Sequence, residues 1–256
     1  MISFRIFLLA YPDNPVGRVF LKTFLKCNVP VQGIIIEEKN RKDNWDRFVK
    51  KVNKDGFLTA FKRVLQVYFL KLTGMNITGL AKRNGLEVHS VNKFNSIACA
   101  ALLDSLDIDL LTIASAPILK DYIFSKAKVG CLNAHPGWLP KYRGLGANAY
   151  CVLNGEKPGV TIHFLDDGID SGMIIAREKL SIRPRDSIAK INDRAMIRGA
   201  EIMSDVIHQF QSGELELPVI KEPLGKLYRS MTYKSARKLN KRISSLSGIK
   251  MEEIIQ

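Results

Sequence analysis

The chain has 256 residues, a formal net charge of +14 at pH 7 and 46% apolar residues. This length suffices for one large domain, or for one domain with a small appendage, and the apolar fraction is typical of a globular protein with a buried core. The strong positive charge indicates an anionic partner: a nucleic acid, an anionic membrane surface or a phosphorylated small molecule. Four scattered cysteines without a C-x-x-C pair argue against a structural zinc site and a disulfide framework, so we expect no metal, reduced thiols and a cytoplasmic protein.

The amino-terminal half alternates apolar runs with amphipathic stretches. Strands are expected at 4–10, 29–38, 86–91 and 109–115, and helices at 17–27 and 96–106. The first apolar run is too short to span a membrane and lacks a clear small-residue cleavage site, so we interpret it as a buried strand. This alternation predicts an α/β fold, in which helices cover both faces of a mostly parallel sheet and the site lies at the carboxyl ends of the strands.

A basic segment at about 39–80 interrupts this alternation. Between Arg41 and Arg83 the sequence has eleven Lys and Arg residues against three Asp, and six large apolar residues from Phe57 to Leu72 recur at helical spacing. One interpretation is a helical insertion whose apolar face packs on the domain. The other is a basic amphipathic helix at a membrane surface or a protein partner.

The carboxyl-terminal part begins with a long predicted helix. It starts at an Asp/Ser cap at 186–187 and stops near Gly213. The residues from Lys226 to Lys250 include eight Lys and Arg and no acid, and 235–246 could form a short helix. We therefore expect a catalytic domain at 1–213 and a basic extension at 214–256.

The sequence CLNAHPGWLPKYRG, at 131–144, places polar residues at the end of an apolar run. In a strand, Asn133 and His135 point to the same face, and Pro136 ends the strand, so both lie at a carboxyl end. An amide donor beside a histidine that can move a proton is a minimal acyl-transfer site. A structural histidine and an asparagine that caps a turn are the alternative.

The sequence GVTIHFLDDGIDSG, at 159–172, is an alternating strand followed by three aspartates. A carboxylate near His135 would orient the imidazole and stabilise its charged form. The aspartates could equally form only a solvated loop, and His163 is expected to be structural.

Together, NAHPGWLPKYRG and NGEKPGVTIHFLDDGIDSG resemble the formyltransferase family, which includes glycinamide ribonucleotide, methionyl-tRNA and nucleotide-sugar N-formyltransferases. The resemblance covers most of 1–213 in strand order, is specific between 110 and 172, and implies a Rossmann-like fold. Asn133, His135 and Asp170 match the catalytic trio of the family. By this resemblance, Asn133 donates to the oxyanion, His135 stabilises it or relays the proton, and Asp170 holds His135, without a metal.

The resemblance also implies binding residues. The formyl donor, 10-formyltetrahydrofolate, would contact Ser115, Ala116, Pro117, Ile118 and Leu119 on one wall, and Leu165, Asp166, Asp167 and Gly168 on the other. The acceptor pocket would be flanked by Tyr142, Arg143 and Gly144. Arg143 could instead form a turn salt bridge, and Arg18, at a helix start, could meet a phosphate.

The chain also departs from the family's patterns. The first strand–helix turn, AYPDNPVGRVF, lacks the glycine-rich phosphate loop of the glycinamide ribonucleotide enzymes, and we expect no second domain like that of the methionyl-tRNA enzymes. The remaining sequence resembles the single-domain formyltransferases associated with amino-sugar synthesis, and this resemblance implies transfer to the amino group of a small anionic acceptor, such as a nucleotide-linked amino sugar. The alternatives are a truncated tRNA formyltransferase that binds RNA through its basic segments, and a non-catalytic folate-binding module. The sequence leaves membrane contact through the basic helix and the oligomeric state open.

Overall fold

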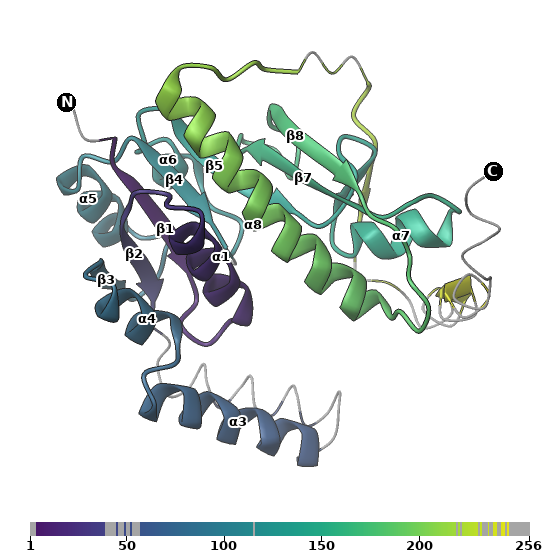
Figure 1. The fold of residues 1–256 in the computed structure, drawn as a ribbon, viewed down its shortest axis with the longest axis horizontal. Helices are drawn as coiled ribbons and strands as arrows, with labels where there is room; N and C mark the ends of the chain where they lie inside the picture. The colour runs from purple at the N-terminus through teal and green to yellow at the C-terminus, as the bar shows by residue number, and fades with distance from the viewer. Residues whose placement is uncertain are drawn as a thin grey trace. The chain divides into compact units, whose positions relative to one another are not determined.

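The computed structural model describes residues 4–38, 45, 49, 52, 57–114, 116–218, 220, 222–229, 231, 235, 238–239, 242–243 and 245. Of residues 59, 60, 63 and 71 it describes the backbone only. The chain forms two compact units, Met1–Cys131 and Leu132–Gln256. Figure 1 labels their helices and strands.

The first unit contains a parallel sheet. Its strands are β1 (Ile6–Ala10), β2 (Val31–Glu37), β3 (Glu87–Val91) and β4 (Leu110–Ile113), in the order β3-β2-β1-β4. Every residue of β1 and β4 is buried. Such continuous apolar runs are expected where helices cover both faces of a parallel sheet.

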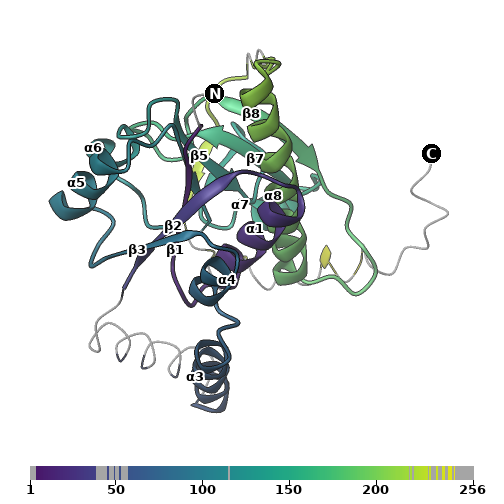
Figure 2. The ribbon, with the colours of Figure 1, turned by 60° about the vertical axis from the view of Figure 1, so that its left-hand side comes forward.

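Helices lie on both sides of this sheet, as the sequence predicts. Figure 2 shows α1 (Pro15–Lys26) and α4 (Ile77–Arg83) on one side and α5 (Ile97–Ser105) and α6 (Asp121–Phe124) on the other. Two residues favour the start of α1 at Pro15. The Asn14 side chain caps the helix by accepting from the N–H of Val16, and proline suits the first turn. The predicted α/β fold is thus confirmed.

The basic segment forms a helix, α3 (Phe57–Leu72), where the apolar spacing predicts one. Eight of its large apolar side chains are exposed, so the expected packing of its apolar face on the domain is not found. Most of 39–56 lies outside the described residues. Among the described residues, no helix is both long and apolar enough to cross a membrane.

The second unit contains antiparallel strands and one long helix. β5 (Gly130–His135) pairs with β7 (Gly159–Phe164), which pairs with β8 (Ile174–Lys179). A short parallel pair joins β6 (Tyr142–Gly144) to β9 (Lys226–Tyr228), and α7 (Ala147–Leu153) follows β6.

The long helix α8 (Ile188–Ser212) has the predicted start and stop. The Ser187 side chain accepts from the N–H of Lys190, and Gly213 ends the helix in the left-handed region at φ 74°. α8 passes close to the strands at Gly199, where an added Cβ would lie 2.9 Å from Val160 Cγ2 and 3.2 Å from Ala134 Cβ. This close contact lets the buried face of α8 form the core with β5 and β7.

Part of the carboxyl-terminal segment packs on the second unit. Leu239 and Ile243 are buried against Ala149, Val152 and Ile191. The described parts of 235–245 include helical residues, in agreement with the expected short helix. The division into 1–213 and 214–256 stays a prediction.

Candidate active site

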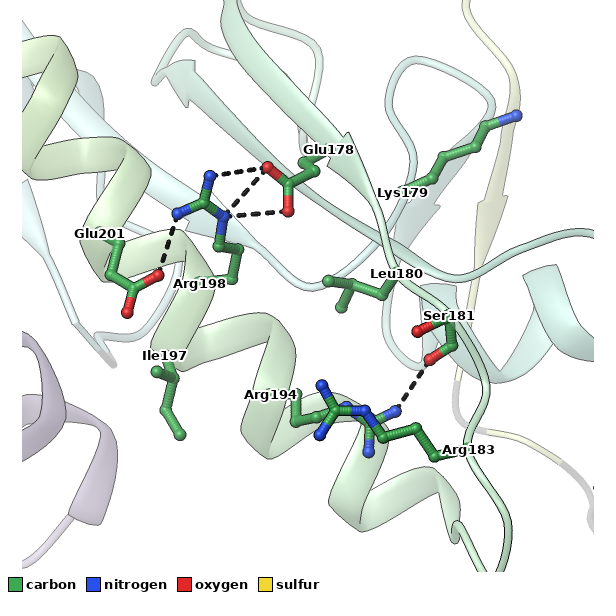
Figure 3. Close-up of a pocket in the computed structure, with 9 residues that line it drawn as sticks. All are labelled: Glu178, Lys179, Leu180, Ser181, Arg183, Arg194, Ile197, Arg198 and Glu201. Atoms are coloured by element: carbon green, nitrogen blue, oxygen red, sulfur yellow. Dashed lines mark hydrogen bonds and ion pairs between the residues drawn. The ribbon is translucent and has the colours of Figure 1, made fainter. Parts of the chain in front are cut away.

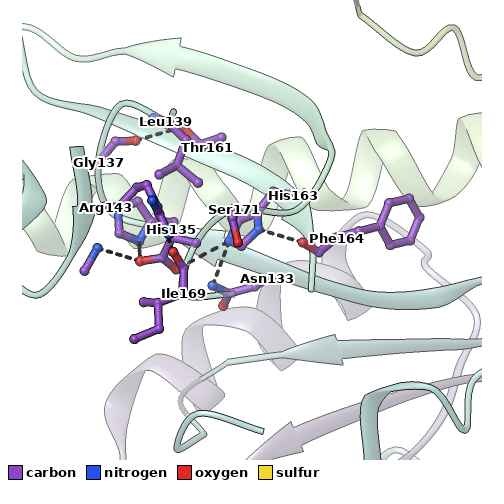
Figure 4. Close-up of polar contacts among 12 residues, drawn as sticks. Asn133, His135, Gly137, Leu139, Arg143, Thr161, His163, Phe164, Ile169 and Ser171 are labelled. Atoms are coloured by element: carbon purple, nitrogen blue, oxygen red, sulfur yellow. Dashed lines mark hydrogen bonds and ion pairs between the residues drawn. The ribbon is translucent and has the colours of Figure 1, made fainter. Parts of the chain in front are cut away.

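Asn133 and His135 end β5, as the sequence predicts, and Pro136 follows the last strand residue. In the register of β5 with β7, Asn133 lies opposite His163 and His135 lies opposite Thr161. Because directly opposite residues of an antiparallel pair share a face, these four side chains lie together. Figure 4 shows them with the contacts that join them.

His135 is held at both ring nitrogens. Nε2 lies 3.0 Å from the Tyr142 carbonyl oxygen, and Nδ1 lies 3.3 Å from Asp170 Oδ2. Burial lowers the pKa of His135 below its ordinary value of 6.5, while Asp170 and the Tyr142 carbonyl partly oppose this. Both ring nitrogens face acceptor oxygens, so the neutral ring donates to only one of them, whereas a ring that has gained a proton donates to both and shares that charge with Asp170. This arrangement is that of a general base with a carboxylate partner.

Asp170 is positioned by β6. Its Oδ2 accepts from the backbone N–H of Gly144 at 2.7 Å, and Arg143 Nε donates to the Ile169 carbonyl at 2.8 Å. Asp170 adopts a positive φ of 49°, which aspartate tolerates better than most residues. Gly144 has φ 82°, and a Cβ there would overlap the Tyr228 carbonyl oxygen. Glycine therefore lets β6 lie close to β9 while its N–H binds Asp170.

Asn133 is oriented by His163, which the sequence analysis treated as structural. Asn133 Nδ2 lies 3.2 Å from His163 Nε2, and His163 Nδ1 lies 2.7 Å from the Phe164 carbonyl oxygen. With its proton on Nδ1, His163 accepts from the Asn133 amide, which keeps a second N–H for a ligand. Burial, together with the nearby His135, lowers the pKa of His163 to about 4, although Asp170, with Oδ1 3.7 Å from Nε2, opposes this.

The neutral state of His163 predicts a pH-dependent stability. Between the ordinary pKa of 6.5 and about 4, the unfolded chain binds a proton that the folded protein excludes. Lowering the pH through this range should thus lower the free energy of unfolding by about 3 kcal/mol through this group. Denaturant unfolding at pH 7 and pH 4.5 measures the difference.

Two variants separate His163 from other titrating groups. His163→Gln should unfold more easily at pH 7 but lose much of the pH dependence. His89→Gln, on β3 in the first unit, should keep it. An equal pH dependence in wild type and His163→Gln would contradict the assignment of a neutral, buried His163.

The loop after β7 offers groups that fit the implied folate donor. Asp166 accepts through Oδ1 from Ser171 Oγ at 2.7 Å and from the Gly168 N–H at 3.1 Å, and both Asp166 and Asp167 are exposed. In the part of the chain that the structure describes, the backbone N–H groups of Leu165, Asp166 and Asp167 have no hydrogen-bond partner. Free backbone donors beside half-buried Leu165 suit the polar edge and apolar face of a pterin.

The other predicted donor wall lies in the first unit. Asn95 holds this segment, since its Nδ2 donates to the Ile118 carbonyl at 2.9 Å and its Oδ1 accepts from the Lys120 N–H at 2.9 Å. Ile118 is 70% exposed and Leu119 is buried. Ser115 lies outside the described residues. The binding role of 115–119 stays a prediction.

The predicted acceptor residues differ in what they contact. The Tyr142 ring is buried, and its hydroxyl donates to Glu156 Oε1 at 2.8 Å, so its contribution to the site is the carbonyl that holds His135. Arg143 binds a backbone carbonyl rather than forming the turn salt bridge. Arg18, on α1 of the first unit, has a buried Nε that finds no hydrogen-bond partner among the described residues, which fits a place for an anion.

A pocket of about 210 Å³ opens beside Asp170 within the second unit. It is lined by Pro140, Asp170, Ser171, Gly172, Met173, Ile174, Pro218, Ile220, Glu222 and Leu224. Arg177 contacts one lining residue, because it donates to Glu222 Oε1 at 2.6 Å, and it also donates to the Leu139 carbonyl at 2.7 Å. Asp170 therefore borders a space that a small ligand could enter.

A second pocket, of about 320 Å³, lies between α8 and the segment at 178–183 (Figure 3). Two of its arginines are already neutralised: Arg194 binds both oxygens of Asp186, and Arg198 binds Glu178 and Glu201. In the described part of the chain, no histidine or cysteine lines it. The cluster of Asn133, His135 and Asp170 is therefore the stronger candidate for the functional site, and its role stays a prediction. Among the described residues, no group of three or more His, Cys, Asp or Glu is arranged to hold a metal ion.

The fold and this site define an α/β protein with a buried His–Asp pair beside an amide donor, the arrangement of a group-transfer enzyme. The family model for formyl transferase matches residues 61–207, more than half of the chain. The chain therefore belongs to the formyl transferase family, whose members transfer formyl groups.

Relatives and solved structures agree with this family. The chain is 31% identical over 147 residues to methionyl-tRNA formyltransferase from Trichlorobacter lovleyi. The aligned residues make up 57% of this chain and 46% of the relative. A relative from Finegoldia magna, with the same name, is 31% identical over 157 residues and is covered over 49% of its length. The chain thus spans about half the length of these relatives.

Two solved structures share the fold over most of the chain. Glycinamide ribonucleotide transformylase 1 from Symbiobacterium toebii has a TM-score of 0.58 and 20% identity, over 82% of this chain and 89% of that one. A sugar N-formyltransferase from Shewanella sp has a TM-score of 0.60 and 15% identity, and the match covers 94% of this chain and 87% of that one. These similarities show the fold and do not identify the acceptor.

Proposed function

We propose that this protein transfers a formyl group from 10-formyltetrahydrofolate to the amino group of a small anionic acceptor, such as a nucleotide-linked amino sugar. The observation that carries the proposal is His135, whose Nδ1 faces Asp170 at 3.3 Å on the strand end that also presents Asn133. Membership of the formyl transferase family gives this cluster its chemistry.

When bound, the folate donor would supply the formyl group as an electrophilic carbonyl. The second N–H of the Asn133 amide is then available to an oxygen that gains negative charge, because His163 occupies only the first. As the acceptor amine bonds to the formyl carbon, His135 would take the proton that the amine loses, and Asp170, which faces Nδ1, would stabilise the resulting imidazolium. The proton would then pass to the folate nitrogen as its bond to the formyl carbon breaks and tetrahydrofolate leaves. The bond from Gly144 to Asp170 keeps the carboxylate in place during this transfer.

Two observations support an anionic acceptor: the positive charge of the chain and its similarity to a solved sugar N-formyltransferase. The chain carries a net charge of +14, and the buried Nε of Arg18 has no hydrogen-bond partner in the described part of the chain. The solved structure named as a sugar N-formyltransferase is similar over 94% of this chain. A phosphorylated amine is therefore the acceptor class that we test first.

A tRNA acceptor is the second candidate. The relatives at 31% identity are named methionyl-tRNA formyltransferases, and the segment from Arg41 to Arg83 has a surplus of basic residues that could contact RNA phosphates. Affinity for RNA through these residues would fall steeply as salt is raised.

The test mixes purified protein with 10-formyltetrahydrofolate and, in separate reactions, nucleotide-linked amino sugars, phosphorylated amines and methionyl-tRNA. Tetrahydrofolate release that requires an amino sugar or a phosphorylated amine supports the first proposal. Release that requires methionyl-tRNA and falls with salt supports the second. Release without any acceptor would indicate a hydrolase, and folate binding without turnover would indicate a binding module.

A further inference from the structure

The apolar face of α3 is exposed along its whole length. Eight large apolar side chains of this helix are between 44% and 69% exposed: Phe57, Leu58, Phe61, Val64, Leu65, Tyr68, Phe69 and Leu72. In Figure 1, α3 lies apart from the sheet of its own unit. An exposed patch of this size on a globular protein usually marks an interaction site.

These residues form one broad stripe. At the helical angle of 100° per residue they occupy about 140° of the circumference. Val67 and Leu70, which are only partly exposed, fall on the other side. The apolar face of α3 is thus turned toward solvent, and the insertion does not use it to cover the core of its unit.

The surroundings of the stripe are basic. α3 carries Lys62, Arg63 and Lys71 and no acidic residue, and Lys82 and Arg83 follow in α4. Trp45, earlier in the same segment, is also exposed, at 64%. Aromatic and aliphatic side chains beside many cations are the composition of helices that lie in the interface of an anionic bilayer.

We propose that α3 docks on an anionic phospholipid surface, with its apolar stripe in the headgroup–acyl boundary and its lysines among the lipid phosphates. This inference does not depend on the proposed formyl transfer. α3 would lie in the plane of the surface, since no described helix could cross a membrane.

A second copy of the chain fits the stripe less well. The seam between two paired helices uses a narrow stripe of about two residues in seven, whereas α3 exposes eight apolar residues in sixteen. Pairing would also bring together two basic segments of chains that each carry a charge of +14. A bilayer accepts the full width of the stripe and neutralises the charge.

Vesicle sedimentation tests the proposal with the full chain. We expect binding to vesicles of phosphatidylcholine with phosphatidylglycerol, much weaker binding to phosphatidylcholine alone, and weakening by salt. The triple variant F61S/L65S/F69S should bind the anionic vesicles at least about a hundredfold more weakly, because three large apolar side chains no longer enter the bilayer.

Matched controls keep the test decisive. I97S/I197S/L217S removes three other exposed apolar side chains and should bind as wild type does. K62E/K71E retains the stripe and should lose affinity mainly at low salt. Circular dichroism and thermal unfolding check that each variant is folded.

Three results would overturn the proposal. They are no binding of folded wild type to anionic vesicles, equal binding by F61S/L65S/F69S and the control triple, and self-association of wild type that F61S/L65S/F69S abolishes. The last result, measured by analytical ultracentrifugation without lipid, would show that a second copy covers the stripe.

Discussion

The variant His135→Asn should lower kcat/KM for formyl transfer by about three orders of magnitude, whichever acceptor the assay identifies. Asparagine fills part of the buried site but cannot accept a proton near neutral pH. The Asp170 carboxylate would then have no imidazolium to stabilise, although Gly144 would still hold it. Steady-state kinetics with saturating donor gives the ratio.

The same substitution elsewhere is the control for His135→Asn. His89, on β3 of the first unit, contacts Glu87 and lies outside the proposed site. His89→Asn should stay within about twofold of wild type, as surface substitutions usually do. Turnover of folded His135→Asn within tenfold of wild type would remove His135 from the mechanism.

The variant Asp170→Asn should reduce kcat/KM by about two to four orders of magnitude. Asparagine tolerates the positive φ of 49° at this position, so the turn can persist, but its neutral amide cannot stabilise the His135 imidazolium. The comparison therefore isolates the carboxylate charge from the backbone that carries it.

The pH profile separates this electrostatic role from a merely structural one. Asp170 raises the pKa of His135 against the larger, opposite effect of burial. Removing the carboxylate should thus shift the acidic limb of the kcat/KM profile to lower pH. Asp205→Asn, which removes an exposed charge on α8, should leave the profile unchanged. A lower rate with an unshifted limb in Asp170→Asn would mean that Asp170 only supports the fold.

The sequence predicted features that depend on neighbours along the chain. The alternation of β5 placed Asn133 and His135 on one face, and Pro136 marked its end. The cap at Ser187 and the left-handed stop at Gly213 marked both ends of α8. Capping, strand alternation and apolar periodicity depend on residues close together in the chain, so they can be recognised from one sequence.

The features that the sequence analysis missed depend on pairing between distant segments. The role of His163 follows from the antiparallel register that sets it opposite Asn133, and one strand alone does not reveal its partner. The three-residue pairing of β6 with β9 joins segments more than eighty residues apart and is too short to give a pattern. The helical spacing of α3 predicted the helix, but not whether its apolar face points to the core or to solvent.

The most direct test of the central claim follows an isotope-labelled formyl group from 10-formyltetrahydrofolate to an amine by mass spectrometry. The wild type and His135→Asn are compared on the acceptor panel at equal concentration. The account predicts a labelled N-formyl product with the wild type and about a thousandfold slower labelling with folded His135→Asn. Equal labelling by the two proteins would contradict this account. It would also be contradicted if the wild type neither bound the folate nor labelled any acceptor.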